Sequence, residues 1–235
     1  MIEAVIARVP ASLATFGCRI AAGPGGAGVR PLSTLRDGAV FDAVIDGFGA
    51  PYGSADRRAV VSLWTQSYLA ALLIPSVTAL LCLGRGLPVG FERVGFELDA
   101  GGVLARFLLP DDAGEPNPSL AALIDGHLRP FVELCHAHSG LSRRVVWGNA
   151  GVIVDLVLRE LGTGADLRPG PLAEAEVCLG RQRGHAVGRC PLAQVFHASG
   201  PSDARRRRVC CMRYRLPGVA SCGPSCPVDH LKAPC

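Results

Sequence analysis

The longest uncharged run in this chain sets the first limit on its fold. After Arg58 come 26 residues without a charged side chain before Arg85. A helical run of that length is long enough to span a bilayer. Polar residues dilute it, however, and Trp64, Tyr68 and Leu72 recur four apart, which is the spacing of a helix face packed on a core. The pattern therefore favours a buried helical element, with a membrane-inserted element as the alternative.

A proline near the middle of this run affects how it folds. Pro75 lies within Asp56–Leu83, and proline lacks the N–H group that a helix interior uses for hydrogen bonding. The residue before a proline also prefers extended backbone geometry. The sequence therefore predicts two buried helices that meet at Pro75, with a boundary at Ile74.

The flanking sequence predicts further helices and a small amount of strand. Met1–Ile20 has apolar residues at helix-compatible spacing and is divided by Pro10. Val89–Pro110 changes period, and the Asp and Gly residues of 99–102 are typical of a tight turn between two strands. We therefore expect two antiparallel strands in the middle of the chain.

Two serines precede the later helices. Ser119 is suited to cap a helix that runs to His138 and that kinks or restarts at Pro130. Ser142 is suited to cap the next helix, which we expect to end at Gly162. The predicted fold class is α+β: a mainly helical body with a small antiparallel β element and an irregular C-terminal loop.

The composition is that of a folded domain. Hydrophobic residues make up 49% and charged residues 19% of the 235 residues, so a substantial core can form. We expect a helical body at 1–200 and a separate C-terminal segment at 201–235. The net charge of +4 is only mildly basic and does not argue for nucleic acid as a partner.

Four of the ten cysteines lie within seventeen residues near the end of the sequence. The surrounding segment, Val209–Pro227, is rich in Arg, Gly, Pro and small residues and has little with which to form its own core. Met1–Leu13 lacks the basic region of a secretory signal, so we expect a cytoplasmic protein. In that reducing compartment clustered cysteines more often mean metal or redox chemistry than disulfides. The candidate metal ligands are Cys210, Cys211, Cys222 and Cys226.

The spacing of these cysteines bears on what they hold. Four thiolates match the ligand count of a [2Fe–2S] cluster and of a structural zinc. Adjacent side chains in an extended segment point in opposite directions, so Cys210 and Cys211 would chelate one small ion awkwardly. A two-iron cluster has a larger footprint and tolerates adjacent ligands better. The spacing favours the cluster, and a non-enzymatic zinc-binding or metal-sensing module stays as an alternative.

The cysteine segment resembles the C-terminal cluster-binding segment of FhuF-type ferric siderophore reductases, which carries C-C-x10-C-x2-C. Ten residues separate Cys211 from Cys222, and the flanking CCMRYRLP is similar to that family. Arg57–Pro75 and Val145–Gly151 (VVWGNAG) also look similar, so the resemblance runs over most of the chain. One spacing departs from the pattern, because three residues separate Cys222 from Cys226 where the family has two.

This departure bears on the fourth ligand. Counting two residues onward from Cys222 reaches Ser225, whose hydroxyl is a poor ligand. The resemblance then implies that Cys226 is the ligand and that the loop bulges by one residue at Gly-Pro. Cys235 is a weaker rival for the fourth position, since chain ends are mobile.

The resemblance implies a cytoplasmic one-electron reductase that carries a [2Fe–2S] cluster. It would pass an electron to Fe(III) in an imported hydroxamate-type siderophore and so release Fe(II). No NAD(P)H or flavin motif is visible, and the glycines of Ala21–Val29 do not form a phosphate-binding pattern. The electron would then come from a separate donor, a ferredoxin or a flavin reductase. The apolar run at 60–84 leaves room for peripheral association with the inner membrane, and a siderophore-binding or biosynthetic relative is a further alternative.

Three other groups of residues have two interpretations each. The Cys-His-x-His group of 135–138 lacks a matching second pair, so helix-end residues are favoured over metal ligands. We expect Asn149 at a turn or helix cap and Trp147 in the core, with siderophore contact as the alternative for both. The arginines near the cysteines either stabilise the more negative reduced cluster or form a solvated basic patch: Arg213, Arg215 and the Arg205–Arg208 run.

Overall fold

The computed structural model describes residues 1–23, 26, 28–99, 101–110, 114–115, 117–162, 166–181, 190–197 and 205–228. The α-helices are α1 (Ile2–Ile6), α2 (Ala14–Gly17), α3 (Gly38–Gly49), α4 (Arg57–Thr78), α5 (Leu120–Leu123), α6 (Arg129–Ser139), α7 (Arg143–Leu161) and α8 (Pro169–Cys178). The strands are β1 (Ile20–Ala22), β2 (Arg30–Pro31), β3 (Gly95–Leu98) and β4 (Leu104–Leu109). Two π-helical segments, η4 (Ala79–Leu83) and η5 (Ile124–Leu128), follow α4 and join α5 to α6. The short 3-10 turns are η1 (Ala11–Leu13), η2 (Leu32–Arg36), η3 (Ala50–Tyr52), η6 (Pro191–Gln194), η7 (Arg213–Arg215) and η8 (Gly223–Ser225).

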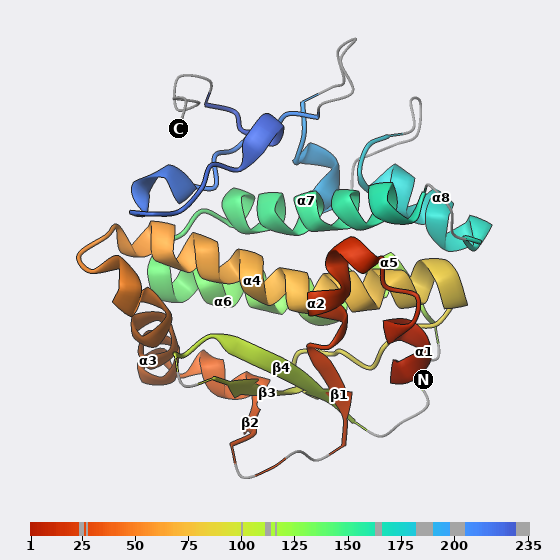
Figure 1. Cartoon of the computed structure of the whole chain (residues 1–235), viewed down its shortest axis with the longest axis horizontal. Helices are drawn as coiled ribbons and strands as arrows, with labels where there is room; N and C mark the ends of the chain where they lie inside the picture. The colour runs from red at the N-terminus through yellow and green to blue at the C-terminus, as the bar shows by residue number, and fades with distance from the viewer. Residues whose placement is uncertain are drawn as a thin grey trace.

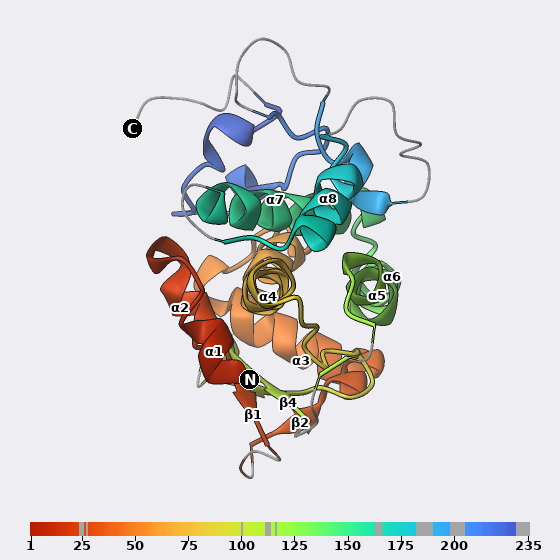
Figure 2. The same ribbon diagram turned by 90° about the vertical axis from the view of Figure 1, so that its right-hand side faces the viewer.

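Helix α4 lies at the centre of the fold. It packs against α7 on one side and against β4 on the other, with α2, α3 and α6 around it (Figure 1). Figure 2, in which α4 is seen end-on, shows α7 and α8 as one layer and the sheet as the opposite one. The C-terminal segment lies on the outer face of α7, so α7 separates it from most of the body.

The sheet has four strands in the order β1-β4-β3-β2. The predicted pair, β3 and β4, is antiparallel and is joined by the predicted turn. Asp99 closes that turn, because its carboxylate accepts hydrogen bonds from the backbone N–H groups of Gly101 (2.8 Å) and Val103 (2.9 Å). The two edge strands are very short, and β1 pairs parallel to β4. The α+β class with a mainly helical body is confirmed, and the domain division near residue 200 stays a prediction.

The prediction of two helices that meet at Pro75 is wrong. Helix α4 runs from Arg57 through Pro75 to Thr78, and the boundary expected at Ile74 is absent from this part of the described chain. A proline in a helix interior costs about 3 kcal/mol. Burial of each large apolar side chain contributes about 1.5–3 kcal/mol, and Leu72, Leu73 and Ile74 are all fully buried. Packing on several sides therefore outweighs the local preference of the proline, and the chain enters the π-helical η4 within one turn.

The burial of this helix matches the core interpretation. Arg57–Leu83 is long and apolar enough to cross a membrane, with a mean hydropathy of 1.7, but 83% of its most apolar window is buried inside the protein. Trp64, Tyr68 and Leu72 all lie in the core, and the Tyr68 ring stacks on Phe131 with ring centroids 3.9 Å apart. The prediction of a buried helix is confirmed. Association with a membrane surface stays a prediction.

The later helices begin near the predicted serines. Ser119 Oγ accepts a hydrogen bond from Ala122 N (3.0 Å), which confirms the cap of α5. The helix passes through η5 and restarts as α6 with Pro130 in its first turn, where the missing N–H is tolerated. Helix α7 begins after Ser142 as predicted, although the Ser142 side chain makes no capping hydrogen bond.

Candidate metal centre

The C-terminal segment is attached to the body through a buried asparagine. Asn149 lies in the middle of α7, so its predicted position at a turn or cap is wrong. Its Nδ2 donates to Ser62 O (3.1 Å) and to Thr65 Oγ1 (2.9 Å) on α4. Its Oδ1 accepts a hydrogen bond from Arg207 Nη2 (2.6 Å). The side-chain amide of Asn149 therefore joins α4, α7 and Arg207, which lies just before the cysteine segment.

Two glycines of α7 allow the following chain to approach closely. A Cβ atom at Gly148 would lie 3.0 Å from Arg207 Nη2, and one at Gly151 would lie 2.7 Å from Val195 Cγ2. The second distance is shorter than real Cβ contacts, so only glycine fits at Gly151 without a shift. Gly148 therefore makes room for Arg207 of the C-terminal segment, and Gly151 makes room for Val195, which precedes that segment.

Helix α4 contacts the same segment along its first half. Ser62 Oγ donates to the backbone carbonyl of Cys211 (2.7 Å), and Arg213 Nη2 donates to Gln66 Oε1 (2.5 Å). Arg215 forms an ion pair with Asp56, whose side chain caps the start of α4. The Arg57–Pro75 stretch is therefore both the core of the body and a support for the cysteines.

The arginine run that precedes the cysteines is structural. Arg205 pairs with Asp155 (2.7 Å) on α7, and its guanidinium lies 4.3 Å from the centre of the Phe196 ring. Burial by itself raises the pKa of Asp155, but hydrogen bonds and charges from Arg181 and Arg205 outweigh it and hold that pKa below its usual value. Arg207 is only 3% exposed. The alternative of a solvated basic patch is therefore wrong for Arg205 and Arg207.

The thiols of the four candidate ligands interact with one another. Cys211 and Cys226 are buried, whereas Cys210 and Cys222 are half-buried. A hydrogen bond from Cys222 is the largest of the effects that lower the pKa of Cys211, and the same bond raises the pKa of Cys222. Cys226 contributes further to the raised pKa of Cys222. Burial raises the pKa of Cys210, with a further contribution from the charges of Cys211 and Cys226.

Backbone N–H groups point at two of the sulfurs. Met212 N donates to Cys210 Sγ (3.3 Å), and the backbone N–H of Arg213 contributes to the lowered pKa of Cys211. Met212 has a φ angle of 59°, the one positive φ of a non-glycine residue in the described chain. Such strained backbone is held only when its surroundings determine it, and it clusters at functional sites. The turn at Met212 thus directs two donors at adjacent thiols.

Arg207 places a positive charge beside these thiols. Burial lowers the pKa of its guanidinium, and the charges of Cys211, Cys222 and Cys210 oppose that effect. Its Nε has no hydrogen-bond partner, and none of the described carboxylates forms an ion pair with it. A buried cation needs an anion nearby, because desolvation of an unpaired charge costs several kcal/mol. The surroundings of Arg207 therefore fit a negatively charged group held by these cysteines.

The loop reaches Cys226 through a tight turn. Gly223 has a φ angle of 70°, a left-handed conformation that glycine adopts without strain. Cys226 N donates to Gly223 O (3.0 Å), and Ser225 O accepts a hydrogen bond from Arg207 N (3.0 Å). This turn lies at the Gly-Pro step where the bulge is expected, and the choice of Cys226 rather than Ser225 as the fourth ligand stays a prediction. Cys235 lies outside the described residues.

Within residues 205–228 and the other described ranges, no three His, Cys, Asp or Glu side chains converge closely enough to hold a metal ion. Assignment of the four cysteines as ligands stays a prediction.

A comparison with protein families decides the relationship of the chain. The model of the family described as "Ferric iron reductase FhuF-like transporter" matches residues 62–199, more than half of the chain. The chain belongs to this FhuF-like family. A curated relative, the "Ferric siderophore reductase" of Escherichia coli (strain K12), is 27% identical over 180 residues. The match covers 72% of this chain and 65% of the relative, so it spans less than two thirds of that protein.

The family match of this FhuF-like chain includes most of α4 and all of α7. Residues 62–199 include Ser62 and Asn149, which hydrogen-bond the C-terminal segment, and end before Cys210. The matched part therefore holds the support for the cysteines, whereas the cysteines themselves lie beyond it.

The histidines near the end of α6 are helix-end residues, as predicted. His136 Nδ1 donates to Leu141 O (3.0 Å), and the His138 ring stacks on Phe41 with centroids 5.1 Å apart. Cys135 is fully buried, and burial raises the pKa of its thiol well above its usual range. These contacts use the group for packing and helix termination.

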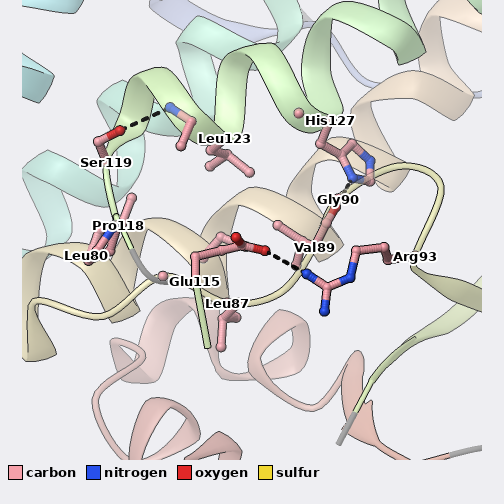
Figure 3. A pocket seen from close by; sticks show the side chains of 14 residues that line it. Leu80, Leu87, Val89, Gly90, Arg93, Glu115, Pro118, Ser119, Leu123 and His127 are labelled. Atoms are coloured by element: carbon pink, nitrogen blue, oxygen red, sulfur yellow. Dashed lines mark hydrogen bonds and ion pairs between the residues drawn. The ribbon is translucent and has the colours of Figure 1, made fainter. Parts of the chain in front are cut away.

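A buried histidine beside a cavity was not predicted from the sequence. His127 lies in η5, its Nδ1 donates to Val89 O, and its Nε2 accepts from the Tyr68 hydroxyl (2.7 Å). Burial lowers the pKa of His127 to about 4, so the ring is neutral. Figure 3 shows it at a cavity of about 260 Å³, where Arg93 and Glu115 form an ion pair. No sequence motif marks this residue.

That cavity lies far from the cysteines. It is lined by Ser76, which is fourteen residues along α4 from the Ser62 contact with Cys211. At 1.5 Å per residue the two positions are about 21 Å apart along the helix. Both ring nitrogens of His127 are occupied by protein partners, so neither nitrogen is free to bind a metal ion.

Proposed function

We propose that the chain is a ferric siderophore reductase that holds a [2Fe–2S] cluster on Cys210, Cys211, Cys222 and Cys226. The observation that carries the proposal is Arg207, a buried guanidinium whose pKa is lowered by burial but raised by the charges of three of these thiols, and which pairs with no described carboxylate. Its charge suits a cluster with four thiolate ligands, which is anionic in both redox states. The family membership and the named relative support reductase activity.

When bound, the cluster would supply one-electron transfer at a potential that the protein sets through charge and hydrogen bonds. Arg207 and Arg213 stabilise added negative charge at the thiolates. The backbone N–H of Met212 does so through its hydrogen bond to Cys210 Sγ. Ser62 and Asn149 hold this turn against the body. Together these groups favour the reduced state.

The substrate would be Fe(III) in an imported hydroxamate-type siderophore. Hydroxamate oxygens are hard ligands that hold Fe(III) far more tightly than Fe(II), so one-electron reduction releases the iron. The sequence shows no nucleotide-binding or flavin-binding motif, so the electron would come from a separate ferredoxin or flavin reductase. This reaction belongs in the cytoplasm, where a reducing environment preserves the thiolates.

The cofactor is tested by anaerobic purification of the full chain. We expect a brown protein that contains about two iron and two sulfide per chain and whose visible absorption bleaches on reduction. A colourless protein with one zinc per chain would instead favour the metal-binding module. A protein that binds siderophores equally well without any cluster would favour the siderophore-binding relative.

A further inference from the structure

A cavity lies directly beside the cysteine segment. Its volume is about 370 Å³, within the range of small-molecule sites. Val209, which lines it, directly precedes Cys210. Gly148, which also lines it, approaches the Arg207 guanidinium. A molecule in this cavity would therefore lie next to the candidate cluster ligands, as an electron acceptor must.

The charge of this cavity is strongly positive. Among the residues that the structure describes, three arginines line it, Arg129, Arg144 and Arg208, and no acidic residue does. Arg129 forms an ion pair with Asp125 (2.9 Å), and Arg208 Nε donates a hydrogen bond to Phe196 O (2.7 Å). Among the described residues no carboxylate pairs with Arg144, which is exposed. At least one full positive charge is therefore available to a ligand.

Two further features suit an anionic ligand with an apolar body. The cavity lies at the start of α7, and the positive end of a helix dipole favours negative charge. Trp147, half-buried in the same wall, offers an aromatic face. Arginines of this kind bind carboxylates with two parallel hydrogen bonds.

We infer that this cavity binds iron(III) chelates of net negative charge, such as hydroxamate siderophores that carry free carboxylates, in preference to neutral or cationic chelates. This inference rests on the proposed reductase function, because it assigns the substrate class of that site. The carboxylates of the chelate meet Arg144 and its neighbours, and the iron lies toward Val209.

Gallium(III) complexes test binding apart from reduction, since gallium has the charge of ferric iron and is not reduced. The cluster-loaded full chain is titrated by calorimetry with the gallium complex of a citrate-based dihydroxamate, which is anionic. The matched probe is a neutral gallium trihydroxamate. We expect about tenfold tighter binding of the anionic complex at low salt, and a smaller difference as ionic strength rises.

Two neighbouring arginines provide a matched pair of variants. Arg144→Gln should weaken binding of the anionic complex about fivefold and leave the neutral complex unchanged. Arg143→Gln removes the same charge from the same helical turn, but Arg143 pairs with Glu133 (2.6 Å) and does not line the cavity. Its effect should be less than about twofold. Equal affinity for the two complexes, no binding of the anionic one, or equal effects of the two variants overturns the inference.

The outcome also separates this inference from the proposed function. A protein that reduces ferric chelates but binds both gallium complexes equally retains the function and loses the charge selectivity. A protein that binds the anionic gallium complex through Arg144 but reduces no ferric chelate retains the site and loses the function.

Discussion

Asn149 is the residue on which the attachment of the cysteine segment most depends. In Asn149→Ala the Arg207 guanidinium loses its acceptor, and the donors to Ser62 O and Thr65 Oγ1 disappear. A hydrogen bond to a charged group contributes about 1.5–3 kcal/mol, and a neutral one about 1 kcal/mol. Thr65 keeps its own hydrogen bond to Ser62 O (2.8 Å), so most of the loss falls on Arg207. We expect the free energy of unfolding to fall by about 3 kcal/mol.

The assay measures stability and cluster content together. Urea denaturation gives the free energy of unfolding, and iron per chain during anaerobic dilution gives the retention of the cluster. The matched control is Thr65→Val, which removes two neutral hydrogen bonds, the one that Thr65 accepts from Asn149 and the one that it donates to Ser62 O, and leaves the Asn149 contact with Arg207 in place. It should cost about 1–2 kcal/mol, less than Asn149→Ala, and retain iron.

The two variants should differ in iron retention as well as in stability. The importance of the Asn149 contact is refuted if Asn149→Ala loses no more stability than Thr65→Val, or if the Asn149→Ala protein keeps its iron as long as the wild type. Either result would mean that the cysteine segment is attached mainly through other contacts.

Three other substitutions test separate parts of the account. Gly151→Ala should destabilise the protein by about 1–3 kcal/mol despite the better helix propensity of alanine, because its Cβ would meet Val195 at 2.7 Å. The control is Gly170→Ala, whose Cβ would meet no described atom within 4 Å. Equal thermal midpoints for the two variants would contradict the close approach of Val195 to α7. Asp155→Asn should cost about 2 kcal/mol at pH 7. The Asp155 pKa is lowered in the folded protein, so its contribution to the free energy of unfolding is present above the usual carboxyl pKa and is lost as pH falls through the lowered value. Urea denaturation as a function of pH should show the stability of the wild type converging on that of the variant in acid. A stability difference that stays constant with pH would refute the ion pair. Cys→Ser changes at each of the four candidate ligands should abolish the cluster spectrum: Cys210, Cys211, Cys222 and Cys226. Cys235→Ser should retain the spectrum. An unchanged spectrum in any one of the four ligand variants would remove that residue from the ligand set.

Local patterns were enough to predict much of the body. The four-residue recurrence of Trp64, Tyr68 and Leu72 correctly predicts a helix face in the core. Asp99 and the following glycines correctly predict the turn between β3 and β4, since the turn is closed by the Asp99 side chain itself. Ser119 likewise predicts a helix start that depends on neighbours within three residues. Each of these features is determined by residues that are close in sequence.

Features that depend on distant partners could not be predicted in this way. Pro75 indicates a helix boundary locally, yet the elements packed around α4 hold it in the helix interior. Asn149 has the local preferences of a cap residue, but its partners lie 58 to 87 positions away. Arg207 belongs to a run that is typical of an exposed patch, and only the folded chain places it against Asn149 and the thiols.

A single turnover without a donor tests the central claim most directly. The cluster-loaded protein is reduced by dithionite, freed of excess reductant, and mixed anaerobically with a ferric hydroxamate chelate and a colorimetric trap for Fe(II). About one Fe(II) should be trapped per reduced chain, and the oxidised visible spectrum should return at the same rate, because a [2Fe–2S] protein delivers one electron. A protein that stays reduced in the presence of the chelate, or that reoxidises without trapped Fe(II), would contradict the central claim.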